Sequence, residues 1–246
     1  MLIIGHRGNG KGPGENTVAA VKRAWEHGAD GVETDIRLTA DHRIVAIHDP
    51  HTSRVTGRRL VVAESTLAEL KSLEMRESQT IPTLDEILQT IPRDKRLFVE
   101  LKSGTALVSP LVRLLSNSPL PPAHVALIGF VDTPDRRAAM TRIKQQLPAH
   151  QVWLLFGAPP KGSTRTRNAQ KDFEEMTSIV EKAGADGVDV ARERLNTALV
   201  ALLKSRGLSV HAWDVDTAAQ AERLRVMGVN SVTTDNVQAL RCGRSG

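Results

Sequence analysis

Short apolar segments alternate with longer amphipathic segments along most of this chain. The apolar segments have the length of buried strands, and capping residues or glycines mark the ends of the amphipathic ones. Neighbouring parallel strands need a crossover connection, usually a helix, so the alternation predicts a parallel sheet. The expected strands are 2–6, 31–38, 96–101, 125–130, 152–156, 187–190, 209–213 and 231–234.

Helices are expected between these strands. Two of them begin with a capping residue followed by proline, at Ser109-Pro110 and at Thr133-Pro134. The others are expected at 17–27, 168–183, 196–206 and 217–227, with a last short helix that begins at residue 235 or 236.

The segment 43–49 is interpreted as an extra strand folded back on 31–38, which leaves eight strands each followed by a helix. This order predicts an α/β fold, a (β/α)8 TIM barrel, which typically takes about 250 residues. A doubly wound open sheet is the alternative, because periodicity does not show strand order. We expect a single domain over 1–246, with a small insertion after the second strand, at 50–92, where two capping boxes predict short helices.

Composition narrows the classes of partner. No run approaches the ~20 apolar residues of a membrane span, so no stable membrane insertion is expected. The first residues lack the basic segment and long apolar core of a signal peptide, and the lone cysteine, Cys242, fits a reducing compartment. A cytoplasmic location is therefore expected.

The net charge of +5 favours anionic partners. Nucleic acid is disfavoured as a partner, because the chain has only four Phe, three Trp and no Tyr to stack on bases. A small phosphate ester is the remaining anionic candidate. The basic cluster Lys161–Arg167 is interpreted as a solvated loop, with attraction of anionic substrates as the alternative.

Two carboxylates, Glu33 and Asp35, lie two residues apart in one expected strand and therefore share a face. A two-residue turn at Ala40 and Asp41 would pair Asp35 with Ala46 and Glu33 with His48. A histidine would then lie beside the two acids. The alternative is that the two carboxylates lie on the solvent-exposed face of an ordinary half-buried strand.

Other strand ends carry polar groups too, and in a TIM barrel the carboxyl ends of all strands meet at one mouth. His6 ends the first strand, Trp213 ends the seventh, and Glu100 and Lys102 share a face at the end of the third. Glu100 would join the two carboxylates of the second strand. Three unpaired acids raise one another's pKa, and a divalent cation removes that penalty.

The glycine-rich loop after the first strand resembles a nucleotide-binding P-loop, but position 12 is glycine where that motif needs Ser or Thr for magnesium. We therefore reject the P-loop interpretation. The glycines still allow backbone amides to approach an anion. Asn16 is interpreted as the N-cap of the first helix rather than as a ligand.

Taken together, these motifs resemble the glycerophosphodiester phosphodiesterase family over nearly the whole chain. The motifs are His6-Arg7-Gly8, Glu15-Asn16-Thr17, Glu33-x-Asp35, His48-Asp49, Ile81-Pro82-Thr83-Leu84, Glu100-x-Lys102, Trp213 and Thr234-Asp235. The family carries an insertion where this chain has 50–92. One departure is His42, which follows Asp41 where the family usually has glycine.

The resemblance implies a TIM barrel that hydrolyses glycerophosphodiesters to glycerol 3-phosphate and an alcohol. It implies that Glu33, Asp35 and Glu100 bind one divalent cation, Mg²⁺ or Ca²⁺. It also implies that His6 and His48 act as general acid and base, and the sequence leaves open which is the base first.

The resemblance further implies that Arg7 and Lys102 meet the phosphate and that Trp213 lines the substrate site. From the family we expect attack by the glycerol 2-hydroxyl through a cyclic intermediate. A lysophospholipase D-type enzyme acting on lysophospholipids is one alternative. A catalytically silent phosphate-binding barrel protein is another, although binding alone does not require two proton carriers.

Overall fold

The computed structural model describes residues 1–10, 14–118, 120–158 and 169–242. Eight parallel strands lie in the order β1-β9-β8-β7-β6-β5-β4-β2, and pairing of β1 with β2 closes the ring. The strands are β1 (Leu2–Gly5), β2 (Gly31–Leu38), β4 (Arg96–Leu101), β5 (Val125–Phe130), β6 (Gln151–Phe156), β7 (Gly187–Ala191), β8 (Ser209–Trp213) and β9 (Ser231–Thr234). The closed ring confirms the predicted TIM barrel and excludes the open sheet.

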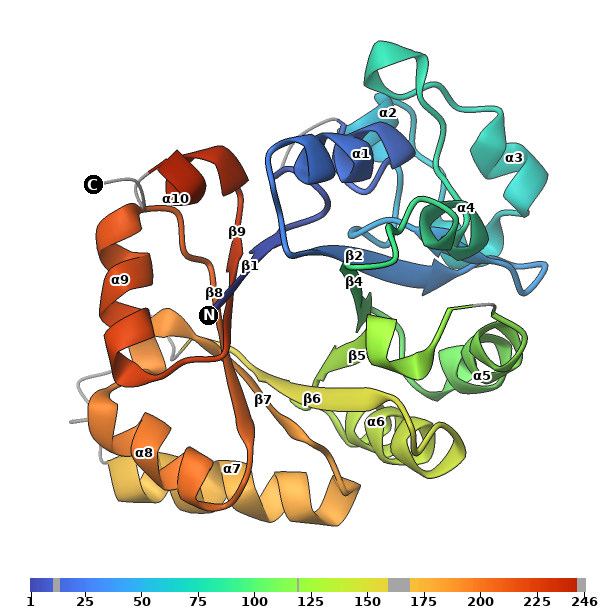
Figure 1. Ribbon diagram of the computed structural model, residues 1–246. Coiled ribbons are helices and arrows are strands. Elements are labelled where there is room, and N and C mark those ends of the chain that lie inside the picture. Colours follow the sequence, from blue (N-terminus) through green and yellow to red (C-terminus); the bar gives the residue numbers. More distant parts are fainter. Residues whose placement is uncertain (11–13, 119, 159–168, 243–246) are drawn as a thin grey trace.

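Helices surround the barrel on the outside (Figure 1). The α-helices between and after barrel strands are α1 (Val18–Glu26), α5 (Val108–Ser116), α6 (Pro134–Gln146), α7 (Ala169–Ala183), α8 (Thr197–Ser205), α9 (Ala218–Met227) and α10 (Val237–Cys242). Short 3-10 turns are η3 (Thr105–Leu107), η4 (Pro122–His124) and η5 (Arg192–Arg194). Among the described residues no helix combines the length and apolar character needed to cross a membrane.

Side chains on each strand alternate between two buried layers. On β4, Leu97 and Val99 face the helices and belong to the large core between the barrel and its helical shell. Phe98 faces the barrel axis, where it joins a second core with Trp153 and Leu155. Successive residues of a strand point to opposite faces, so a polar residue two positions after an inward apolar one also faces the axis. This alternation brings the strand-end acids to the inside of the barrel mouth.

The insertion after the second strand folds against the side of the barrel near β2 (Figure 1). It contains α2 (Ser53–Thr56), η1 (Val62–Glu64), α3 (Leu67–Lys71), η2 (Arg76–Ser78) and α4 (Leu84–Leu88). The capping boxes predicted at Thr66 and Thr83 are present at the starts of α3 and α4. A separate apolar cluster that includes Val55, Leu70 and Ile81 holds the insertion together.

The hairpin beside β2 is formed as predicted, but with a different register. Its second strand is β3 (Ile44–Ala46), shorter than the predicted 43–49, and Ala46 pairs with Ile36 instead of with Asp35. The reason is the turn, since His42 adopts a left-handed backbone conformation with φ 57° and lengthens the loop to three residues. This is the position where the related family usually has glycine, the residue that adopts such a conformation most easily.

Two predicted helix starts are wrong. Thr17, not Asn16, caps α1, because the Thr17 side chain accepts a hydrogen bond from the Ala20 amide. Helix α5 begins at Val108, directly after η3, so Ser109 lies inside the helix instead of capping it. The predicted start at Thr133 is correct. The basic cluster Lys161–Arg167 and residue 12 of the glycine loop lie outside the described residues.

Candidate active site

A cavity of about 170 Å³ lies at the carboxyl ends of the barrel strands. Seven of the eight residues that the sequence predicts for the site line it, and the eighth, Asp35, is fully buried beside them. The lining residues are His6, Arg7, Glu33, His48, Glu100, Lys102, Ile128, Phe130, Leu155, Asp189, Trp213, Asp214 and Thr233. The fold therefore brings together residues that are spread over more than two hundred positions of the chain.

The acids form one compact cluster. Glu33, Asp35 and Glu100 each offer a carboxylate oxygen, and these oxygens lie within 4.8 Å of one another. Asp35 and Glu100 are direct neighbours in the parallel pairing of β2 and β4, which explains their proximity. The exposed fractions are 4%, 0% and 6%, so water contributes little to screening their charges.

Two cations balance part of this charge. Lys102 Nζ lies 2.9 Å from Asp35 Oδ1 and 2.5 Å from Glu100 Oε1. Arg7 Nε lies 3.2 Å from Asp35 Oδ2, and the Arg7 amide donates to Glu33 Oε2 at 2.9 Å. Burial alone would raise the pKa of Asp35, but Lys102 and Arg7 together lower it, so Asp35 is ionised. Burial and the neighbouring acids raise the pKa of Glu33 well above its usual value.

The donor set fits a hard divalent cation. Three carboxylates are the ligands that Mg²⁺ and Ca²⁺ prefer. The Oε1 atom of Glu33 is buried and has no hydrogen-bond partner among the described residues, so one oxygen of the cluster is available as a ligand. A cation would also remove the repulsion that raises the pKa of Glu33 and of Glu100. Glu33, Asp35 and Glu100 are the residues that could hold such an ion.

His6 follows β1 and lies beside the acid cluster. Its Nδ1 atom is 2.7 Å from Asp235 Oδ1, and its Nε2 atom is 3.9 Å from Glu33 Oε2. An ionised carboxylate can only accept, so Nδ1 carries the proton donated to Asp235 and Nε2 remains for proton transfer. Asp235 thus orients the ring, in agreement with its place in the Thr234-Asp235 motif.

His48 follows β3 and reaches the same cavity from the hairpin. Its Nδ1 atom lies 2.7 Å from Asp49 Oδ1, so Nε2 is the ring nitrogen that could exchange a proton in this histidine as well. Burial lowers the pKa of the His48 imidazole, and attraction to Asp35 offsets only part of that effect. Despite the changed register, His48 therefore lines the cavity, and its imidazole is neutral near pH 7.

Arg54, in helix α2 of the insertion, links Asp49, the partner of His48, to Glu15. It donates to Asp49 Oδ2 at 2.7 Å and to both carboxylate oxygens of Glu15 at 2.6 and 2.7 Å. Glu15 in turn accepts from Arg7 Nη1 at 2.8 Å. This chain of charged hydrogen bonds ties the insertion to the barrel mouth and fixes the position of His48. No sequence signal distinguished Arg54 from its arginine neighbours at 58 and 59.

Asn16 is a site residue whose role the sequence analysis missed. Its Nδ2 atom donates to Asp35 Oδ2 at 2.9 Å, and its Oδ1 atom accepts from the Asp35 amide at 3.0 Å. Its backbone has φ 57°, a conformation that asparagine tolerates better than most residues. Asn16 therefore positions a carboxylate of the cluster. Its place in the Glu15-Asn16-Thr17 motif was the available signal.

The cavity has two sides of different chemical character, which we call the charged wall and the apolar wall. The charged wall consists of His6, Arg7, Glu33, Glu100 and Lys102, from β1, β2, β4 and the residues that follow them. The apolar wall consists of Ile128, Phe130, Leu155 and Trp213, from β5, β6 and β8. The rings of Phe130 and Trp213 meet edge to face, with centroids 6.3 Å apart.

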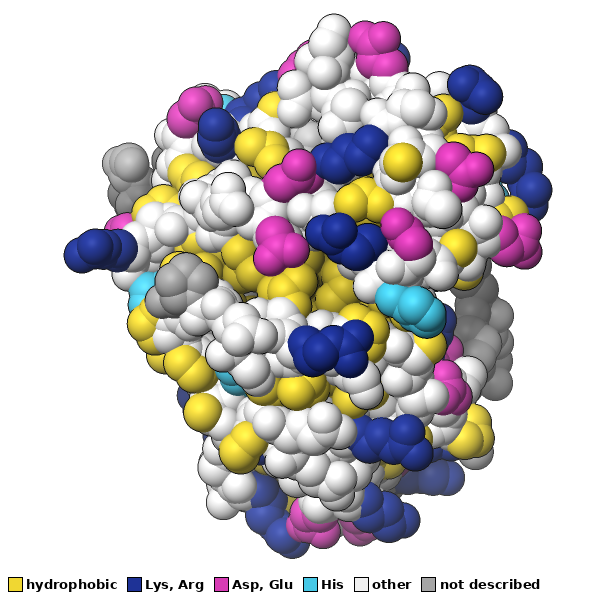
Figure 2. Space-filling model, turned by 90° about the vertical axis from the view of Figure 1, so that its right-hand side faces the viewer, with side chains coloured by type: hydrophobic (Ala, Val, Ile, Leu, Met, Phe, Trp, Pro, Cys, Tyr) yellow, Lys and Arg dark blue, Asp and Glu magenta, His cyan; other side chains and the backbone are white. Residues whose placement is uncertain are grey.

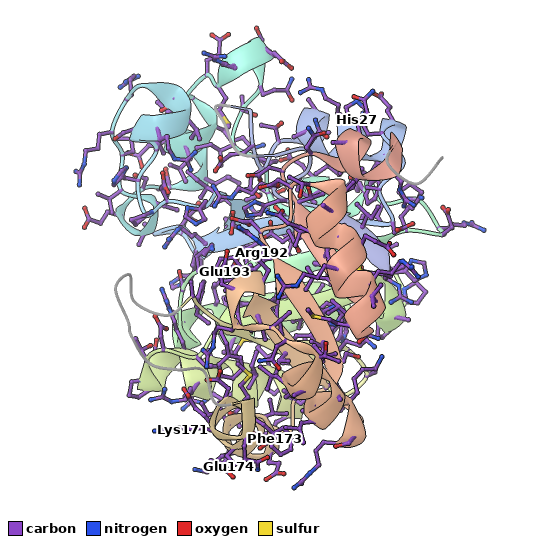
Figure 3. The ribbon with its side chains drawn as sticks, turned by 90° about the vertical axis from the view of Figure 1, so that its left-hand side faces the viewer. His27, Lys171, Phe173, Glu174, Arg192 and Glu193 are labelled. Atoms are coloured by element: carbon purple, nitrogen blue, oxygen red, sulfur yellow. The ribbon has the colours of Figure 1, made fainter. Side chains whose placement is uncertain are left out.

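The chain after β8 is anchored at the mouth by an arginine. Arg192, which is labelled in Figure 3 beside Glu193, lies on η5 directly after β7. It donates a hydrogen bond to the backbone carbonyl of Asp214 and lies 3.0 Å from Glu193 Oε1. Asp214 lines the cavity and lies 3.7 Å from His6 Nδ1. The contact therefore holds a further acidic side chain near the catalytic histidine candidate.

A larger cavity of about 610 Å³ lies between the hairpin turn, α4 and α5. Figure 2 shows this side of the molecule, where hydrophobic side chains lie in a hollow between charged ones. Its lining residues include Arg43, Leu88 and Arg113, and none of the eight predicted site residues. The described residues that line this larger cavity include one histidine and one acid, so the smaller cavity is the candidate active site.

Comparison with known proteins finds relatives along nearly the whole chain. The glycerophosphodiester phosphodiesterase of Caldanaerobacter subterraneus subsp. tengcongensis is 29% identical over 251 residues, which cover 97% of this chain and 96% of that protein. The structure of an Oleispira antarctica phosphodiesterase in complex with sn-glycerol-3-phosphate superimposes with a TM-score of 0.82 at 23% identity, covering 100% of this chain and 97% of that one.

A glycerophosphodiester phosphodiesterase from Parabacteroides distasonis superimposes with a TM-score of 0.78 at 25% identity, over 99% of this chain and 97% of that one. The Glycerophosphoryl diester phosphodiesterase family matches residues 6–115 and 132–239. The match contains all eight predicted site residues and most of the barrel. The chain therefore belongs to the glycerophosphoryl diester phosphodiesterase family of phosphodiester hydrolases.

Proposed function

We propose that this protein hydrolyses glycerophosphodiesters to glycerol 3-phosphate and an alcohol, using one divalent cation and two histidines. The observation that carries the proposal is the cavity where a cluster of three buried carboxylates adjoins two histidines, each of which contacts a carboxylate of its own. A phosphodiester is anionic and a poor electrophile, so charge neutralisation and proton transfer are the two tasks such a site must perform.

Glu33, Asp35 and Glu100 would hold the cation, either Mg²⁺ or Ca²⁺. When bound, the ion supplies neutralisation of charge on the phosphoryl oxygens. Lys102 Nζ lies against two of these acids and lines the cavity, so it presents a positive charge to the phosphate from the same side. Arg7 lines the cavity as well and adds a second positive charge.

The histidines divide the proton transfers. His48 accepts the proton of the attacking hydroxyl at Nε2 in the first step, because burial keeps its imidazole neutral near pH 7. His6 supplies a proton to the departing oxygen from Nε2, with its Nδ1 atom held by Asp235. In the second step the two exchange roles, as the family resemblance leads us to expect.

Trp213 and the rest of the apolar wall would enclose the organic part of the substrate. The cavity volume of about 170 Å³ suits a small head group better than an acyl chain. This favours a deacylated glycerophosphodiester over a lysophospholipid. The cytoplasmic location and the division into a single domain over 1–246 with an insertion at 50–92 stay predictions from the sequence.

The test is hydrolysis of glycerophosphocholine, followed by release of glycerol 3-phosphate. We expect release with Mg²⁺ or Ca²⁺, loss of activity in excess EDTA, and recovery when the cation is restored. Full activity in excess EDTA would contradict metal dependence. Binding of glycerol 3-phosphate without turnover under any divalent ion would support the silent phosphate-binding protein instead. Parallel assays with a lysophospholipid distinguish this function from that of a lysophospholipase D-type enzyme, which would prefer the lysophospholipid.

A further inference from the structure

Asp189 lines the cavity and has no part in the proposed chemistry. Asp189 lies on β7, opposite β2 in the ring, because three strands separate β7 from β2 in either direction. Register places it beside Leu155 of β6 and His211 of β8. Trp213 stands two residues further along β8, so Asp189 lies one layer deeper, at the floor of the cavity.

One carboxylate oxygen of the buried Asp189 side chain has no partner among the described residues, although the carboxylate accepts a hydrogen bond from the Val190 backbone amide. This oxygen is Oδ1, and the residue is 5% exposed and lines the cavity. Buried polar atoms normally have a partner, and an unpaired one costs free energy unless a ligand or water fills the place. If residue 189 served only to pack the core, leucine or valine would stabilise the fold more than aspartate does.

Among the described residues, the charged groups that act on Asp189 are two acids, Glu100 and Asp214. Ile128 and Leu155 line the cavity beside it, and His211 stacks on Trp153 with a pKa lowered to about 3 by burial, so it is neutral. Burial, with added repulsion from Glu100 and Asp214, raises the pKa of Asp189 to about 8. A carboxyl group here can exchange hydrogen bonds with a hydroxyl in either protonation state, since a hydroxyl both donates and accepts.

We propose that Asp189 is a specificity-determining residue that hydrogen bonds to the terminal hydroxyl of the substrate's glycerol group at the floor of the cavity. The proposal rests on the proposed function, which places the phosphate at the charged wall across the barrel. The glycerol group then extends toward β7, where the apolar wall offers its hydroxyl few other partners. A site built around such a hydroxyl rejects an analogue that lacks it, because its own polar group is left unpaired.

The experiment compares glycerophosphocholine with 2-hydroxypropyl phosphocholine, which keeps the nucleophilic hydroxyl and lacks the terminal one. Asp189→Leu removes the polar group at similar size, and Asp189→Asn keeps donor and acceptor atoms. We expect the wild type to favour the glycerol substrate by about tenfold to a hundredfold in kcat/KM. Asp189→Leu should abolish this preference by losing activity on glycerophosphocholine alone, while Asp189→Asn should keep most of it.

A binding measurement separates this proposal from the proposed function. Calorimetric titration with glycerol 3-phosphate and with 2-hydroxypropyl phosphate, in the presence of Mg²⁺, reports the same preference without turnover. Equal affinities in the wild type, or equal losses on both ligands in a folded Asp189→Leu variant, would overturn the role of Asp189. Retained discrimination together with no hydrolysis under any divalent ion would overturn the proposed function and leave Asp189 as a hydroxyl-binding residue. Thermal melting confirms that each variant is folded.

Discussion

The charged wall and the apolar wall face each other across one small cavity, but different interactions hold each of them together. The charged wall consists of buried ionisable groups that hold one another in place through short ion pairs, such as the contact of Lys102 with Asp35 at 2.9 Å. The apolar wall consists of aliphatic and aromatic groups that continue the core inside the barrel. In the proposed function, the charged wall would carry the reaction and the apolar wall would bind the organic part of the substrate.

The difference also affects how each wall responds to mutation. Removing one partner of a buried charge network leaves the remaining charges unpaired, which costs about 3–5 kcal/mol. Truncating an aromatic residue at the rim of a cavity loses contact area and leaves no charge exposed to the interior. We therefore expect large effects on turnover from the charged wall and the acid beneath it, and moderate effects on substrate binding from the apolar wall.

The largest expected effect is from Asp35→Ala. Asp35 contacts both Lys102 and Arg7 and is a proposed cation ligand, so its loss should lower kcat/KM about 10³-fold or more, because metal ions supply several kcal/mol to such reactions. Steady-state hydrolysis of glycerophosphocholine measures the change. Asp132→Ala, which removes an exposed carboxylate, is the control and should keep wild-type activity. Near-normal turnover by a folded Asp35→Ala enzyme would contradict the proposed role of Asp35 as a cation ligand.

A second large effect is expected from His48→Gln. Loss of a general base typically lowers the rate about 10²–10⁴-fold. The base must be neutral, and burial lowers the pKa of His48, so wild-type kcat/KM should fall as pH drops through a value below 6.5, and the variant should lack this limb. The pH dependence of kcat/KM is the measurement. His27→Gln, on a histidine that contacts Asn9 outside the cavity, should leave the profile unchanged.

The smallest expected effect is from Trp213→Leu in the apolar wall. Loss of the edge-to-face contact with Phe130 and of aromatic surface should raise KM about threefold to tenfold and leave kcat nearly unchanged, since such contacts are worth about 1 kcal/mol. Trp25→Leu, in α1 and partly buried against the core outside the cavity, is the matched control and should not change KM. A fall in kcat as large as that of His48→Gln would show that the two walls are not separate in function.

Much of the charged wall could be predicted from single strands. Glu33 and Asp35 share a face because side chains alternate along a strand, and the same rule pairs Glu100 with Lys102. The capping boxes at Thr66 and Thr83 are local patterns and are also present as predicted. These features depend on neighbours a few residues away, which is the range over which sequence periodicity is informative.

Other parts depended on contacts distant in sequence and were predicted wrongly or not at all. The hairpin register differs from the predicted one by one residue because His42 has a left-handed backbone conformation. Asn16 was predicted to cap a helix, but its side chain donates a hydrogen bond to Asp35. Arg54 reaches Asp49 and Glu15 only because the insertion packs against the mouth.

The sequence by itself determined the eight strands and the residue types at the strand ends, because alternation and capping act locally, and it favoured a barrel over an open sheet. Only the tertiary structure decided which of these groups touch. Closure of the ring through β1 and β2 places His6 beside Glu33, and it sets Asp189 across the barrel from both. Strand order is a long-range property, since it follows from how helices and strands pack together and leaves no period in the sequence.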